Sequence, residues 1–212
     1  MTMRTTKILD MLNDGKIEEL RAALMDEIFT ETLKGKPNAR KRYMAMKKYL
    51  AYTSNAREIL KKPCEIEFEG DKYLSFCNSY SLALTTEGCG EIAMCDEQDR
   101  YPDVSRIIHF EGEERLIDFN RVIAEAKSKG YKLTKNEMMG NNYLMEYDGA
   151  YFRIALIDIT YGILNDGGEA RVFHVSGSRR PIAFKNDIGL GVIMPVHFEG
   201  EPEEGMTIIK VE

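Results

Sequence analysis

Residues 64–70 read Cys-Glu-Ile-Glu-Phe-Glu-Gly, and this alternating stretch decides the class of fold. The apolar side chains at positions 66 and 68 fall on one face of an extended chain, and the glutamates fall on the other. This pattern is typical of a half-buried strand. Gly70-Asp71 predicts a turn, and residues 73–76 begin a returning strand. The stretch therefore predicts an antiparallel hairpin.

Upstream of this hairpin, the first 62 residues predict helices. Apolar residues between Lys16 and Thr32 recur at helical spacing, and Gly35-Lys36-Pro37 interrupts the pattern. A second helix is expected from about residue 39 to 60, and Pro63 would stop it.

Downstream, strands and helices are mixed without regular alternation. Strands are expected at 80–86, 104–110, 143–147, 170–175, 182–185 and 190–198, with a further short one possible at 207–211. A helix is expected at 115–128, ending at Gly130, while residues 152–164 fit either a helix or a strand. This order predicts an α+β fold with antiparallel sheets that carry helices on one face, rather than a doubly wound parallel sheet.

Composition restricts the class of protein further. The chain has 212 residues and a net charge of −6, and no apolar run approaches the roughly 20 residues of a membrane span. No secretory leader is expected at the N-terminus, which favours a cytoplasmic protein. Without a leader, and with enough residues for a core, the four cysteines (Cys64, Cys77, Cys89 and Cys95) are expected to be reduced thiols. Neither they nor the three histidines have metal-ligand spacing. Neither a metal nor another cofactor is predicted.

Charge is distributed unevenly along the chain. Between Lys34 and Lys62, ten basic residues are opposed only by Glu58, so this segment carries +9 and the rest of the chain carries −15. A basic segment on an acidic body can attract a polyanion to one face. A solvated helix face is the more common origin of such a run.

Motifs for catalysis are scarce. The sequence contains no phosphate-binding loop and no nucleophile elbow. The segment Ser176–Arg180 could hold an anion, although a hairpin connection is favoured. Four clustered carboxylates could hold Mg²⁺, although a solvated loop is favoured; they are Asp96, Glu97, Asp99 and Asp103. We therefore expect a protein that is not an enzyme.

Three segments resemble, in order, the bacterial DNA polymerase sliding clamp family. Residues 180–196, Arg-Pro-Ile-Ala-Phe-Lys-Asn-Asp-Ile-Gly-Leu-Gly-Val-Ile-Met-Pro-Val, are similar to the end of that family, which closes in a Met-Pro element. Residues 101–108, Tyr-Pro-Asp-Val-Ser-Arg-Ile-Ile, resemble the stretch that leads into the last clamp domain. Residues 74–83 resemble a strand that carries Thr-Asp-Gly in the family and Cys77-Asn78-Ser79 here. The resemblance covers roughly residues 40–198 and implies a shortened, divergent clamp-like protein.

The resemblance implies a domain division and two kinds of site. It divides the chain into a helical segment 1–38, a helix-plus-sheet unit 39–100, a C-terminal domain 101–200 and an acidic tail 201–212. Clamps contact the backbone of double-stranded DNA through basic helices; the matching residues here are Arg40, Lys41, Arg42, Lys47 and Lys48. Clamps also dock short hydrophobic motifs of replication proteins in an apolar pocket; the matching residues are Leu82, Val192, Met194, Pro195 and Val196. For Leu82 and Val192 a simple core role is equally open.

Oligomeric state and alternatives follow from the same resemblance. Three helix-plus-sheet units per chain (helices near 39–60, 115–128 and 155–164) would close a ring of twelve units from four copies, or three copies if the first helix adds a unit. A homo-oligomer is therefore possible. The alternatives are a monomeric or dimeric protein-binding module that does not bind DNA, and an enzyme that uses the acidic loop from Asp96 to Asp103.

Overall fold

The computed structural model describes residues 5–52, 57–88, 90, 92–96, 101–133, 142–175, 177, 179–198, 202 and 204–211. The helices are α1 (Thr5–Asn13), α2 (Ile17–Thr32), α3 (Pro37–Tyr52), α4 (Phe119–Ser128) and α5 (Ile154–Leu164). The strands are β1 (Cys64–Phe68), β2 (Asp71–Cys77), β3 (Ser81–Thr85), β4 (Glu113–Ile117), β5 (Tyr143–Tyr147), β6 (Ala150–Arg153), β7 (Ala170–His174), β8 (Ile182–Asn186), β9 (Gly189–Ile193) and β10 (Thr207–Val211).

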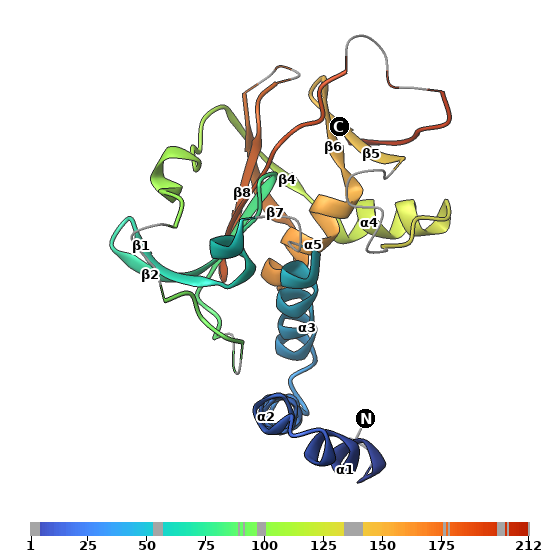
Figure 1. Cartoon of the computed structure of the whole chain (residues 1–212). Helices are drawn as coiled ribbons and strands as arrows, with labels where there is room; N and C mark the ends of the chain where they lie inside the picture. Colours follow the sequence, from blue (N-terminus) through green and yellow to red (C-terminus); the bar gives the residue numbers. More distant parts are fainter. Residues whose placement is uncertain are drawn as a thin grey trace.

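Two sheets organise the body (Figure 1). The larger sheet has seven strands in the order β1-β2-β3-β9-β8-β7-β4, and all neighbours in it are antiparallel. The smaller sheet has the order β10-β5-β6, and in it β10 runs parallel to β5. The predicted mixture of helices and antiparallel sheets is confirmed. The larger sheet joins strands from both sides of residue 100 through the β3–β9 pair.

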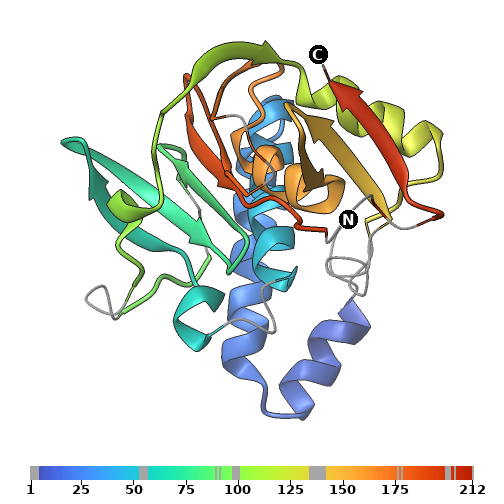
Figure 2. The ribbon, with the colours of Figure 1, turned by 90° about the horizontal axis from the view of Figure 1, so that it is seen from above.

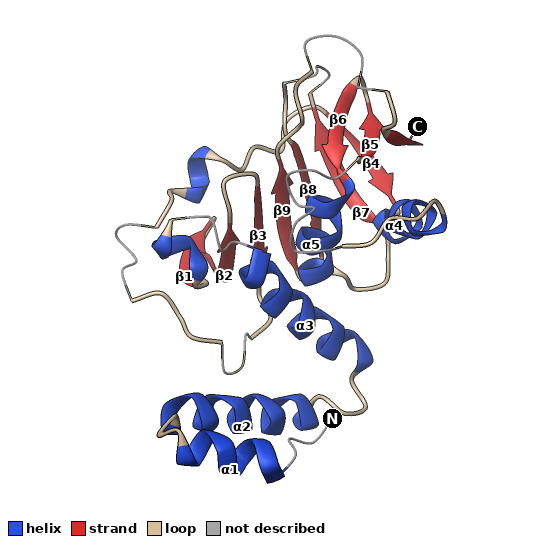
Figure 3. Cartoon of the chain, turned by 45° about the vertical axis from the view of Figure 1, so that its right-hand side comes forward, coloured by secondary structure: helices blue, strands red, loops and turns tan. Residues whose placement is uncertain are grey.

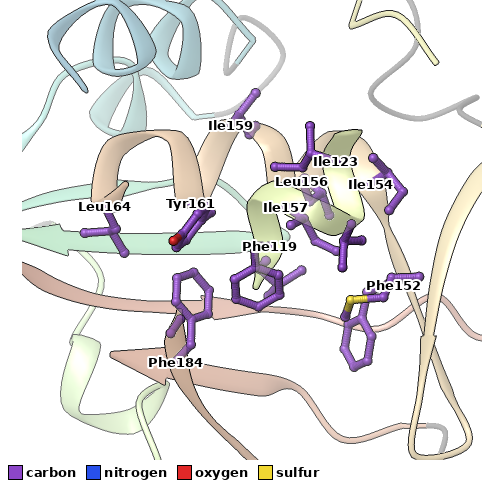
Figure 4. Close-up of a cluster of buried hydrophobic side chains, with 14 of the residues drawn as sticks. Phe119, Ile123, Phe152, Ile154, Leu156, Ile157, Ile159, Tyr161, Leu164 and Phe184 are labelled. Carbon is purple, nitrogen blue, oxygen red and sulfur yellow. The ribbon is translucent and has the colours of Figure 1, made fainter. Parts of the chain in front are cut away.

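Helix α5 forms the centre of the main core. All of its residues except Asp158 and Gly162 are buried, as expected for a helix that is apolar on every side. Figure 4 shows its side chains packed against Phe119 and Phe184. The ring of Phe119 lies 5.1 Å from the rings of both Tyr161 and Phe184. One core therefore ties α4, α5 and the larger sheet together.

A second core lies on the opposite face of the larger sheet. Its buried residues come from β1, β2, β3, β8, β9 and the segments around 60 and 101–108. Tyr101 holds the segment 101–108 to β2, because its hydroxyl donates a hydrogen bond to the carbonyl of Ser75 at 2.9 Å. Both faces of the sheet are thus covered, and every residue of β3 and β9 is buried.

Helices α1 and α2 lie side by side at the N-terminal end of α3, away from the sheets (Figures 1 and 3). Leu20 is the one buried residue of the two helices. Helix α2 is held to α3 by the rings of Phe29 and Tyr43, 4.8 Å apart, and by Asp26. We call residues 5–32 the N-terminal hairpin.

Several sequence predictions differ from the structure. The helix predicted from about residue 39 to 60 is α3, which ends at Tyr52, and the strand predicted at 190–198 is β9, which ends at Ile193. The strand predicted at 104–110 is wrong: Val104–Arg106 is a 3₁₀ turn, because Asp103 accepts a hydrogen bond from the amide of Ser105. The helix predicted from residue 115 begins at Phe119, because Asp118 caps it and Glu113–Ile117 pairs with β7. The ambiguous segment 152–164 is the end of β6 followed by α5.

The three helix-plus-sheet units counted from the sequence are not separate. Helices α3 and α5 lie together against one continuous sheet, and α4 packs beside α5. Among the described residues, no helix combines the length and the apolar character that a membrane crossing needs.

Candidate interaction surfaces

A groove of about 870 Å³ runs between α3 and α5 on the side away from the sheet. Its apolar lining comes from Leu33, Pro37, Met44, Ala45 and Ile159. Its cationic lining consists of Lys34, Arg40, Lys41 and Lys48. We call it the α3–α5 groove. It combines an apolar floor with a basic rim.

The spacing of residues along α3 explains the chemistry of this groove. The face that includes Tyr43, Met46 and Tyr49 is buried, and the hydroxyl of Tyr49 donates to the carbonyl of Ser81 at 2.8 Å. The other face carries exposed cations and Met44, which is 50% exposed. Gly162 lets the two helices approach closely, because a Cβ there would lie 3.1 Å from the Cβ of Ala45.

Two of the five cations predicted to contact DNA are paired with carboxylates of the same chain. Arg42 is 8% exposed, and its guanidinium donates to Glu87 Oε1 at 2.7 Å and to the carbonyl of Asn165 at 3.3 Å. The ammonium of Lys47 donates to Asp26 Oδ2 at 2.6 Å. Only Arg40, Lys41 and Lys48 of the predicted set lie on the groove.

The Met-Pro element forms a second, smaller cavity of about 200 Å³. After β9 the chain leaves the larger sheet, and the amide of Val196 donates to the carbonyl of Tyr151 on β6 at 2.7 Å. The cavity is lined by Tyr80, Arg153, Leu156, Met194, Pro195, Val196 and His197. We call it the Met-Pro cavity. It lies where the two sheets and the first turn of α5 meet.

The Met-Pro cavity is apolar with a cation in its wall. The amide of Met194 donates to the carbonyl of Tyr80 at 2.9 Å, which fixes these two walls relative to each other. Burial lowers the pKa of the Arg153 guanidinium, an effect that the neighbouring Tyr80 opposes. Met194 is 39% exposed, so an apolar ligand could reach it from solvent.

Leu82 and Val192 do not belong to this cavity. They face each other across the β3–β9 pair, and each is 1% exposed within the second core. Because both faces of the larger sheet are covered, neither side chain is open to a peptide. Both residues therefore have the core role that the sequence analysis left open.

The other candidate residues that the structure describes do not gather into a site. Asp96 lies 3.6 Å from Lys62, and Asp103 caps the 3₁₀ turn. Glu97 and Asp99 lie outside the described residues, as do Ser176 and Ser178. Among the residues that are described, no group of three His, Cys, Asp or Glu side chains could hold a metal ion. Cys64, Cys77 and Cys95 form no disulfide with one another, and Cys89 is not described.

Sequence reasoning missed several residues that line these surfaces. Tyr80, Arg153 and Leu156 come from segments far from the Met-Pro element, and only the sheet pairing brings them to it. Lys34 lay within the basic run, so its charge was a usable signal. Comparison with protein-family models, with curated proteins and with solved structures gave no match for this chain.

Proposed function

We propose that this chain is a non-enzymatic, clamp-like protein that contacts the backbone of double-stranded DNA through the α3–α5 groove. One observation carries the proposal: α3 and α5 lie side by side on one face of an antiparallel sheet, and α3 presents exposed cations beside the groove between them. Such a surface can contact phosphates without reading bases. The net charge of −6 would keep DNA away from the remaining faces.

A salt titration tests this proposal directly. The probe is a short fluorescent duplex in two unrelated sequences, and its anisotropy is measured at several salt concentrations. We expect equal affinity for both sequences and a steep loss of affinity with salt. Replacing Arg40, Lys41 and Lys48 by Ala should reduce the slope of log K against log salt by about 0.9 for each lost phosphate contact.

A matched variant controls for net charge. Lys72, Arg121 and Lys127 are exposed cations on β2 and α4, away from the groove. Replacing these three by Ala changes the charge by the same amount and should leave the slope unchanged. Equal losses of slope in both triple variants would contradict DNA contact at the groove.

A second candidate function is a protein-binding module that does not bind DNA. The observation that favours it is the Met-Pro cavity, whose apolar walls and adaptable Met194 suit a short hydrophobic motif of a replication protein. Binding of such peptides is measured by isothermal titration. Met194→Glu should abolish binding, and Val175→Glu, at a similarly exposed position, should not.

A further inference from the structure

Six of the eleven exposed large apolar side chains in the described part of the chain lie on the N-terminal hairpin. Its exposed large apolar side chains are Leu9 (52%), Leu12 (47%), Ile17 (61%), Leu24 (37%), Met25 (38%) and Ile28 (58%). Clustered apolar surface of this kind marks a site of association. The hairpin thus carries a face that another molecule would cover.

On α2 this face points away from the body. Ile17, Leu24 and Ile28 are spaced by seven and four residues, which places them on one side of the helix. Asp26, which holds α2 to α3, follows Ile17 by nine residues and therefore lies on the opposite side at 3.6 residues per turn. While that contact is kept, this stripe cannot reach the groove of its own chain.

Charge points to one occupant of the α3–α5 groove. The N-terminal hairpin contains seven acidic residues and three basic ones, a net charge of −4. The groove has four cations on its rim and only Asp158 as a carboxylate on its lining, where Asp158 accepts a hydrogen bond from Tyr131 at 3.1 Å. An acidic helix with an apolar stripe matches an apolar floor with a basic rim.

We propose that the hairpin of each copy docks into the α3–α5 groove of a second copy, which gives a two-fold dimer. The hairpin joins the body through Leu33–Pro37, and Leu33 and Pro37 themselves line the groove. Each N-terminal hairpin is therefore attached next to the groove of its own chain, so two copies can dock reciprocally. A two-fold arrangement of this kind uses the same two surfaces on both copies and therefore closes on itself. The proposal does not depend on DNA contact.

Light scattering on a sizing column, without DNA, tests the dimer. We expect a mass of about twice 24.2 kDa, and dissociation that begins at a higher protein concentration when salt is raised, because salt screens the charges between hairpin and groove. Ile28→Glu damages the stripe and Met44→Glu damages the groove floor, and both positions are at least half exposed, so the fold should survive. Each variant alone should have the monomer mass, while Leu116→Glu, at an exposed position on β4, should remain dimeric.

Mixing the two variants distinguishes this arrangement from a contact between two hairpins. A mixture of Ile28→Glu and Met44→Glu contains one intact hairpin and one intact groove, so it should form a heterodimer. A dimeric Met44→Glu variant, a mixture that stays monomeric, or a monomeric wild type would each overturn the proposal. A second groove variant, Lys48→Glu, should weaken the dimer by reversing the charge of the rim.

DNA binding is measured separately, on the Ile28→Glu variant, whose groove is intact and unoccupied by a second copy. If the Ile28→Glu variant does not bind DNA and the wild type is a dimer, the proposed function alone is refuted. A monomeric wild type that binds duplex at the groove would refute the dimer alone. The two proposals can therefore fail independently.

Discussion

Helix α5 and the N-terminal hairpin are both rich in apolar residues, yet their surroundings are opposite. Nine of the eleven residues of α5 are buried, whereas α1 and α2 together bury only Leu20. Figure 2 shows α5 enclosed by the sheets while the hairpin extends beyond α3. Apolar content alone therefore does not distinguish a core helix from an association surface. The difference is whether the rest of the chain supplies a partner, and this can be measured by substitution.

The largest effect is expected within α5. Ile157 is fully buried between α5 and the strands beneath it (Figure 4). Ile157→Ala should lower the free energy of unfolding by about 2–5 kcal/mol, because the lost contacts leave a cavity that the core fills only partly. Denaturation in urea measures this, with an unchanged m-value as the control for two-state unfolding. A loss below about 0.5 kcal/mol would contradict a packed core around α5.

A smaller effect is expected at the junction between α3 and the body. Arg42→Ala removes the donor to Glu87 and to the carbonyl of Asn165. We expect a loss of about 1–3 kcal/mol, since water can reach Glu87, whose side chain is 34% exposed. Arg40→Ala is the matched control on the exposed face of α3 and should change stability by less than about 0.5 kcal/mol. Equal losses would show that the two arginines share one environment.

The strands and the buried helix also differ in how far the sequence predicts them. The β1–β2 hairpin follows from alternation, because only one face of β1 is consistently apolar. The sequence left α5 open between helix and strand, because a segment that is apolar on every side has neither the helical nor the strand periodicity of apolar and polar residues. The sequence of β3 does not reveal that both faces of its sheet are covered by other parts of the chain. Leu82 was therefore a candidate for the peptide pocket although it is a core residue.

The candidate groove was predictable only in part, for a related reason. A run of cations reveals charge but not partners that lie far away in the chain. Arg42 pairs with Glu87 and Lys47 with Asp26, and neither pair has a local sequence signal. The remaining cations of the set reach the groove because they lie on the exposed face of α3. Folding thus divides one basic segment into structural and available charges.

A still smaller effect on the free energy of unfolding is expected at the contact between the N-terminal hairpin and α3. Burial acts to raise the pKa of the Asp26 carboxyl, but hydrogen bonds from Lys47 and Tyr43 outweigh it and hold that pKa below its ordinary value. The folded state therefore gains stability that is full above the ordinary pKa of about 3.9 and is lost as the pH falls through the lowered value.

Comparing the wild type with Asp26→Asn isolates this contribution. The wild type should be more stable by less than about 1 kcal/mol near neutral pH, and the difference should shrink as the pH falls below the ordinary carboxyl pKa of about 3.9. In a Lys47→Met background the difference should shrink at neutral pH, because the main partner is gone. A difference that grows as the pH falls would have the wrong sign for a lowered pKa.

The smallest effect is expected on the exposed stripe of the hairpin. Ile28 is 58% exposed, so Ile28→Ala should change the free energy of unfolding by less than about 0.5 kcal/mol when measured at a concentration where the protein is monomeric. At concentrations where light scattering shows a dimer, the same substitution should cost more, because dimerisation stabilises the folded chain by mass action. A cost that matches Ile157→Ala at every concentration would place Ile28 in a core of its own chain. A cost that rises with concentration would identify the hairpin as a helix pair whose core is completed by another molecule.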